Sequence, residues 1–184
     1  MTNTLPILLT WDKGQAFAER MSRQVLGLEG YTDIDPQSPM GGPDGLKDII
    51  CSKVGKKFIV GCYFPSRQQK FSAIKTKFRS DFSGVIKNTA HGFIFITNQR
   101  ITPAQRKELS KTCNVKIIIF HGERIAGILD SPEGYSIRYE YLGIEPTTAE
   151  LMALCLGAKK EREEIKKTLT EIHTLISKTC LKGI

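Results

Sequence analysis

The chain has 184 residues, which is close to one ordinary domain plus an appendage, with 40% hydrophobic and 25% charged residues. These fractions are typical of globular proteins and exclude a disordered, fibrous or low-complexity chain. The 27 Lys and Arg residues outnumber the 19 Asp and Glu residues, and the net charge of +8 predicts a surface that attracts polyanions, nucleic acid first among them.

The cysteines and the apolar segments indicate a soluble cytoplasmic protein. The five cysteines are odd in number, widely spaced and without a CxxC pair, which fits neither a disulfide framework nor a zinc site. The first residues carry no basic leader, and no stretch approaches the roughly 20 apolar residues of a membrane helix. We therefore expect no membrane contact.

The first third of the chain predicts one helix, a long loop and a hairpin. Apolar residues at steps of four, four and three predict a helix over residues 15–28 with one buried face: Phe17, Met21, Val25 and Leu28. Residues 30–45 contain three prolines and a Gly-Gly pair, which predict a long shaped loop. Two β-rich runs, residues 48–52 and 57–64, flank a short glycine-containing connection and predict two antiparallel strands.

Helices and buried strands alternate in the next part. A basic amphipathic helix is predicted from the stripe Phe71, Ile74, Phe78, Phe82 and Val85. Residues 92–97 and 115–120 are nearly continuous apolar runs, as in parallel strands covered on both faces. Between them Thr102 and Pro103 predict a helix start, and another short helix follows at residues 123–129.

This order predicts an α/β fold in which helices flank a mixed central sheet, with a helical extension at the C-terminus. Residues 1–145 would form the sheet domain. Residues 146–184 would form the extension, where the apolar residues alternate spacings of four and three over a heptad seam from Leu151 to Ile176, interrupted by Arg162. Such a seam predicts oligomerisation or docking to a partner.

Two acids in the Gly-Pro loop are candidate metal ligands. Asp44 lies in the loop and Asp48 lies at the start of the first hairpin strand. Carboxylates fixed at a strand end can hold Mg²⁺, which needs only one or two carboxylates plus waters. Aspartates in such loops also serve as turn formers, and the spacing alone does not separate the two roles.

Five motifs follow one another along roughly residues 12–130, outside the heptad region: Phe17-Ala-Glu19, Gly42-Pro-Asp44-Gly45, Lys47-Asp48-Ile-Ile, Phe93-Ile-Phe-Ile-Thr-Asn-Gln and Ile118-Ile-Phe-His-Gly-Glu-Arg-Ile-Ala. Their order resembles the Mrr-type restriction-endonuclease family of the PD-(D/E)xK nuclease superfamily. The resemblance implies a restriction-endonuclease-like sheet domain that binds and, with Mg²⁺, cleaves DNA in defence against foreign DNA.

By this resemblance Asp48 would be the metal ligand and Glu19 an assisting glutamate, with Asp44 as a second loop acid. The sequence departs from the family where the next strand should carry an acid or glutamine and then a lysine, because Gly61 and Tyr63 stand there. Asp44 could replace the missing carboxylate. Lys57, Arg67 or Lys70 could replace the missing lysine.

Basic residues define the expected nucleic-acid surface. Between residues 65 and 87, six basic residues stand against one acid, Asp81, which gives this stretch a charge of +5. The candidate phosphate contacts are Lys57, Arg67, Lys70, Lys75 and Arg79. A solvated helix face would have the same composition.

Other polar residues are interpreted as structural. His91, His121 and His173 lack a nucleophile pattern, and Thr97, Asn98 and Gln99 are typical of a strand-to-helix turn. Two functions therefore stay open. One is a nucleic-acid-binding, Mg²⁺-dependent endonuclease with a degenerate site, and the other is an inactive nuclease-fold scaffold whose C-terminal helix recruits another copy or a sensor subunit.

Overall fold

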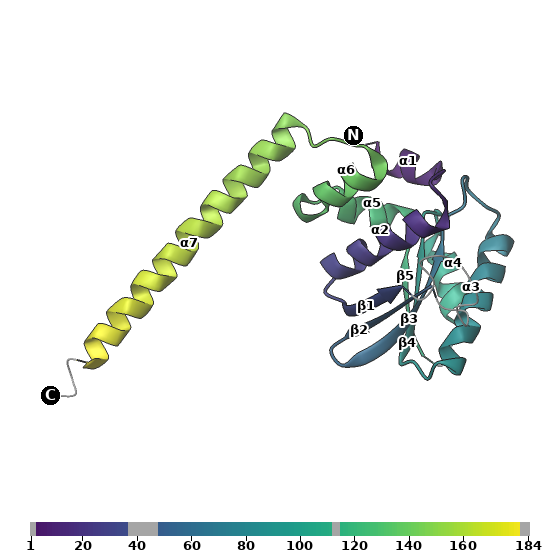
Figure 1. Cartoon of the computed structure of the whole chain (residues 1–184), viewed down its shortest axis with the longest axis horizontal. Helices are drawn as coiled ribbons and strands as arrows, with labels where there is room; N and C mark the ends of the chain where they lie inside the picture. Colours follow the sequence, from purple (N-terminus) through teal and green to yellow (C-terminus); the bar gives the residue numbers. More distant parts are fainter. Residues whose placement is uncertain (1–2, 37–47, 112–114, 181–184) are drawn as a thin grey trace. The chain divides into compact units, whose positions relative to one another are not determined.

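The computed structural model describes residues 3–36, 48–111 and 115–180. The chain divides into two compact units, Met1–Glu145 and Pro146–Ile184. The first unit is built around a five-stranded sheet with helices on both faces, as the alternation of segments predicted. The second unit contains one long helix (Figure 1).

The sheet has the strand order β1-β2-β3-β4-β5. Its strands are β1 (Thr32–Pro36), β2 (Ile49–Lys53), β3 (Lys56–Tyr63), β4 (Gly92–Thr97) and β5 (Lys116–Phe120). Strands β1, β2 and β3 form an antiparallel meander, and β3, β4 and β5 are parallel. The predicted hairpin and the two predicted parallel strands are confirmed.

The loop predicted for residues 30–45 is wrong at residues 32–36, which form β1. Among residues 32–35, the part of β1 whose side chains the structure describes, only Ile34 packs against the core. A single apolar residue shows no alternation of apolar and polar residues that would predict a strand. Asp33 also has a positive φ of 50°, which interrupts regular pairing with β2. The predicted loop from residue 37 to residue 45, including Asp44, lies outside the described residues.

One face of the sheet is covered by α2 (Gly14–Leu28), α1 (Thr4–Leu9), α5 (Gly122–Leu129) and α6 (Tyr135–Leu142), as Figure 1 shows. A short 3₁₀ turn, Pro132–Gly134, joins α5 to α6. Helices α1 and α6 were not predicted, since neither shows a clear apolar period over its short length.

The predicted buried face of α2 is partly wrong. Met21 and Val25 are fully buried, but Phe17 and Leu28 are 44% and 42% exposed. Ala18 and other small or apolar residues of α2 are buried instead, so the face that contacts the sheet is rotated from the predicted stripe.

The opposite face of the sheet packs against α3 (Phe71–Lys87) and α4 (Pro103–Ser110). The predicted apolar stripe of α3 is confirmed, because Ile74, Phe78 and Val85 are at most 2% exposed. The ring of Phe78 meets those of Phe93 and Phe95 edge to face, at 5.3 Å between centroids in each case. These contacts fix α3 against β4, next to β3.

The second unit contains α7 (Thr148–Cys180), a single helix of 33 residues. Its residues are exposed throughout the part whose side chains are described, residues 148–172, except Glu150, which is partly buried. No helix among the described residues is long and apolar enough to cross a membrane.

Candidate functional site

Asp48 is fixed beside the end of β3. Its backbone N–H donates to the carbonyl of Val60 at 3.2 Å, and its Oδ2 accepts a hydrogen bond from the backbone N–H of Cys62 at 2.5 Å. The β2–β3 register pairs Ile49 with Val60, so Asp48 lies next to Gly61. Asp48, the predicted metal ligand, therefore lies beside the end of β3 at which the resemblance would put the acid and the lysine of the second motif.

Gly61 allows α3 to approach the sheet at this point. A Cβ atom added to Gly61 would lie 2.6 Å from Oδ2 and 2.8 Å from Cβ of Asp81, both closer than real Cβ contacts. Asp81 is a residue of α3 that is 6% exposed. The space that an acidic side chain at position 61 would enter is thus filled by a carboxylate from another element.

Lys77 lies one helical turn before Asp81 and forms an ion pair with it. Its Nζ donates to Oδ1 of Asp81 at 2.7 Å, with the Lys77 side chain 35% and the Asp81 side chain 8% exposed. Burial by itself lowers the pKa of Lys77, but the hydrogen bond and charge of Asp81, with smaller contributions from Asp48 and Cys62, raise that pKa above its usual value. The ammonium group is therefore charged at neutral pH.

Acidic residues on both faces of the sheet affect the pKa of the buried thiol of Cys62. Burial raises the pKa of this thiol well above its usual value, and the charge of Asp48 raises it further. The neighbouring Ser22 hydroxyl lowers this pKa, and the charges of Glu19 and Asp81 raise it. Glu19 of α2, Asp48 and Asp81 thus all act on one buried group. Cys62 itself is a neutral core residue.

Of the three acids expected at the site, two lie close to this strand end. Glu19 is partly buried on α2, across the sheet from Asp81, and lines a pocket of about 600 Å³ together with Arg20 and Arg23. Asp44 lies outside the described residues. The sequence pattern missed Asp81 and Lys77, because they lie on a helix that reads as an ordinary basic amphipathic segment.

Tyr63 has a packing role. Its ring stacks on Phe95 at 6.5 Å between centroids and an interplanar angle of 27°. Its carbonyl accepts a hydrogen bond from the Thr97 hydroxyl at 2.6 Å. Tyr63 therefore packs against β4 and does not supply the positive charge of the lysine that the resemblance would put at this position.

The described residues contain no group of three or more His, Cys, Asp or Glu side chains arranged to hold a metal ion. Two carboxylates still meet the requirement of Mg²⁺, which takes one or two carboxylates and keeps several waters. Asp48 and Asp81, on either side of Gly61, are the two that could hold it.

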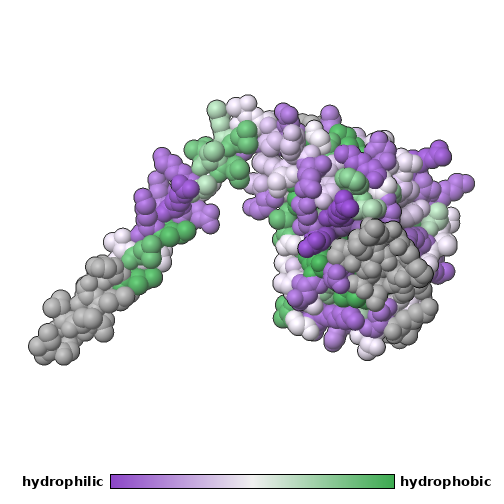
Figure 2. Space-filling model, in the orientation of Figure 1, coloured by the Kyte–Doolittle hydropathy of each residue, from purple (hydrophilic) through white to green (hydrophobic). Residues whose placement is uncertain are grey.

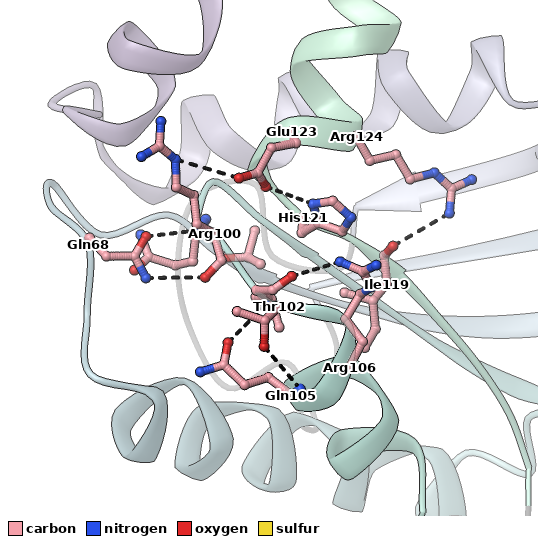
Figure 3. Close-up of polar contacts among 12 residues, drawn as sticks. Gln68, Arg100, Thr102, Gln105, Arg106, Ile119, His121, Glu123 and Arg124 are labelled. Carbon is pink, nitrogen blue, oxygen red and sulfur yellow. Dashed lines mark hydrogen bonds and ion pairs between the residues drawn. The ribbon is translucent and has the colours of Figure 1, made fainter.

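A second polar region lies where β4 and β5 end, and Figure 3 shows part of it. Glu123 contacts Nδ1 of His121 at 2.9 Å and Nε of Arg100 at 3.5 Å. Thr102 and Gln105 form the capping box that starts α4. These contacts join the polar residues to one another and to their own helix starts, which agrees with the structural interpretation of His121.

The buried polar residues after β4 also have structural partners. Thr97, Asn98 and Gln99 are all fully buried. Asn98 donates to the carbonyls of Leu8 and Pro65 at 2.6 and 2.8 Å, and Gln99 accepts from the backbone of Gln69 at 2.6 Å. They hold the segment between β3 and α3 in place, as a strand-to-helix turn should.

The predicted basic surface separates into different regions. Arg67, Lys70 and Arg79 are exposed, whereas Lys75 forms an ion pair with Glu108 of α4. Lys57 lies at the start of β3, the end remote from Asp48, and its Nζ donates to the carbonyl of Asn88 at 3.3 Å. Four other basic residues line a separate pocket of about 550 Å³: Lys53, Lys56, Lys116 and Arg124.

Comparisons with known proteins give no match. No protein-family model matches the chain, and no curated protein and no solved structure matches it at a significant level. Function is therefore inferred from the geometry around Asp48, Asp81 and Lys77.

Proposed function

We propose that the first unit is a restriction-endonuclease-like domain that binds DNA in a defence system and cleaves its phosphodiester bonds with Mg²⁺. The observation that carries the proposal is the position of Asp81 over Gly61, beside Asp48. The carboxylate of Asp81 and the ammonium group of Lys77, both from α3, would replace the acid and the lysine that β3 of this chain lacks.

The topology supports this proposal. A helix, an antiparallel meander, a crossover helix and a parallel strand follow one another as α2, β1-β2-β3, α3 and β4. Apart from β1, which the sequence did not predict, this order is the one expected from the resemblance. Asp48 directly precedes β2, the second strand of the meander, where the resemblance would put a metal-binding aspartate.

The chain's residues divide the work of phosphodiester hydrolysis. Asp48 and Asp81 would hold the ion, and Mg²⁺ when bound supplies Lewis acidity and an activated water. Lys77 stays protonated because Asp81 raises its pKa, so it acts as a fixed positive charge next to the scissile phosphate. It is unsuited to take a proton at neutral pH.

DNA cleavage tests the proposal. The full chain is incubated with plasmid and linear DNA in Mg²⁺ or Mn²⁺, alongside Asp48→Ala and Asp81→Asn. We expect metal-dependent cleavage by the wild type and a loss of about 100-fold or more in each variant, the scale of removing a group that stabilises transition-state charge. Asp33→Asn is the matched control. Asp33 lies at the end of β1 that is away from Asp48, and asparagine tolerates the positive φ of this position.

The variants must distinguish loss of the metal site from loss of the folded structure. Circular dichroism must show that Asp48→Ala and Asp81→Asn remain folded. Cleavage that persists in both variants at the wild-type rate overturns the assignment of the site, whereas cleavage lost equally in Asp33→Asn points to a general defect of the folded domain.

Two observations favour a second function, an inactive scaffold. Asp81 is buried and already paired with Lys77, and Tyr63 is committed to stacking on Phe95. A scaffold of this kind would bind its partner without hydrolysis. Folded wild-type protein that binds DNA or protein, but cleaves no DNA in either metal, would support it over the enzyme.

A further inference from the structure

The second unit carries a row of exposed apolar side chains along α7. Leu151, Ile165, Leu169 and Ile172 are 46–60% exposed. Their spacing follows a heptad in which Leu151, Ala158, Ile165 and Ile172 take the d positions, and Cys155, Arg162 and Leu169 take the a positions. Figure 2 shows apolar patches on this helix on both sides of a hydrophilic stretch.

We propose that α7 pairs with α7 of a second copy of the chain as a parallel, in-register coiled coil. The proposal is independent of the function proposed for the first unit. A 3.5-residue period suits a helix partner, since it keeps the a and d positions facing one neighbour along the whole contact. The charges beside the seam then decide between parallel and antiparallel pairing.

Parallel pairing brings opposite charges together. Glu161 takes a g position and Lys166 takes the following e position. In a parallel coil a g residue faces the following e residue of the other helix, so Glu161 faces Lys166 of the second copy, and the symmetry forms this pair twice.

Antiparallel pairing brings like charges together. The antiparallel register that uses the whole seam places Cys155 opposite Ile172 and Arg162 opposite Ile165 of the second copy. In that register e positions face e positions, so Lys159 faces Lys166 of the second copy twice. Two repulsive pairs replace two attractive ones, and the parallel arrangement is favoured.

Arg162 fixes the register at a cost in stability. A polar residue at a single a position weakens a coiled coil but specifies how the helices align. In register, each Arg162 lies beside Glu161 of the second copy, whose carboxylate offsets the like charge of the facing arginine. A shift by one heptad would place Arg162 against Cys155 or Leu169 without that arrangement.

Disulfide formation at Cys155 tests the orientation. Cys155 is an exposed free cysteine, whereas Cys51 and Cys62 are fully buried. In full-length chain carrying Cys113→Ser and Cys180→Ser, parallel pairing places the two Cys155 residues in one a layer, within reach of a disulfide. We expect mild oxidation to convert most of the chain to a covalent dimer.

A matched cysteine outside the seam is the control. In the same background, Cys155→Ser with Lys160→Cys moves the thiol to the outward f position. We expect little crosslinking there. Equal crosslinking at both positions, or none at Cys155, overturns the parallel coil.

Charge exchange tests the pairing independently. By sedimentation or light scattering, Glu161→Lys and Lys166→Glu should each weaken dimerisation severalfold. The double exchange should recover only part of the loss, because positions 161 and 166 attract each other again while Arg162 has lost its neighbouring carboxylate. In the antiparallel arrangement Lys166→Glu would instead strengthen the dimer. A wild-type chain that stays monomeric at its highest soluble concentration, or that assembles into more than two copies, also overturns the proposal.

Discussion

At Gly61, the absence of a side chain decides how closely α3 approaches the sheet. The contact distances of 2.6 and 2.8 Å to Asp81 leave no room for even a methyl group. The glycine that departs from the motif of the family resembled by the sequence therefore makes room for Asp81. Inserting the family's glutamate at position 61 would displace α3, so that exchange is not expected to restore activity.

Gly61→Ala should lower the free energy of unfolding by about 1–3 kcal/mol, the usual cost of overpacking. Asp81→Ala removes the carboxylate from the contact, so the two changes should couple favourably by about 0.5 kcal/mol or more in a double-mutant cycle. Denaturant unfolding of the four proteins gives this value. Strict additivity would show that the carboxylate of Asp81 does not restrict the space at position 61.

Lys77→Met should lower the free energy of unfolding at pH 7 by about 1–2 kcal/mol, because it leaves the buried Asp81 carboxylate without its ion pair and Lys77 is itself partly exposed. Lys75→Met, which breaks a more exposed pair with Glu108, should cost about 0.5 kcal/mol or less. Equal losses would contradict the special role of Asp81.

The pKa of Lys77 also gives a pH dependence with a definite sign. This pKa is raised in the folded state, so the stabilisation is complete below the unfolded lysine pKa of about 10.4 and is lost as pH rises through the folded value. The difference in unfolding free energy between wild type and Lys77→Met should therefore shrink above about pH 10. A difference that stays constant from pH 8 to pH 11 would contradict this ion pair.

At the scale of elements, patterns within one segment were predictable and contacts between segments were not. The stripe on α3 and the apolar runs of β4 and β5 gave correct elements, because period and composition are local properties. The hairpin turn at Val54 and Gly55 was indicated by its glycine, and both residues adopt positive φ. The contact of Asp81 with Gly61 joins residues of different elements, so no local pattern could show it.

The exposed basic residues on and before α3 should contribute to DNA binding. Lys70→Glu with Arg79→Glu should weaken binding to all sequences about equally and reduce the salt slope by about 2, since each phosphate contact contributes about 0.9. Lys75 is a poorer choice because Glu108 already holds it. The control is Lys56→Glu with Lys116→Glu, which makes an equal charge change in the separate pocket that these two lysines line.

At the scale of the whole molecule, the chain consists of a packed sheet unit and a helix whose described side chains are nearly all exposed. The core of the first unit comes from residues before position 145, on both faces of the sheet. The heptad seam predicted the long helix of the second unit, because a period is visible without any partner. The heptad period alone does not identify the partner that packs against this helix.

Removal of residues 146–184 should leave the first unit folded. Because its core lies within Met1–Glu145, the shortened chain should unfold cooperatively with a melting temperature close to that of the full chain at low concentration. It should also be monomeric at concentrations where the full chain dimerises. A shortened chain without cooperative melting would show that α7 stabilises the sheet unit.

Metal binding at the end of β3 is the most direct test of the account. Mn²⁺ is titrated into the full chain and followed by electron paramagnetic resonance, with Asp48→Asn, Asp81→Asn and the control Asp33→Asn. We predict one bound Mn²⁺ per chain in the wild type and the control, with affinity reduced about tenfold or more in each of the other two variants. Binding that is absent from the wild type, or unchanged by both substitutions, would contradict a site shared by Asp48 and Asp81.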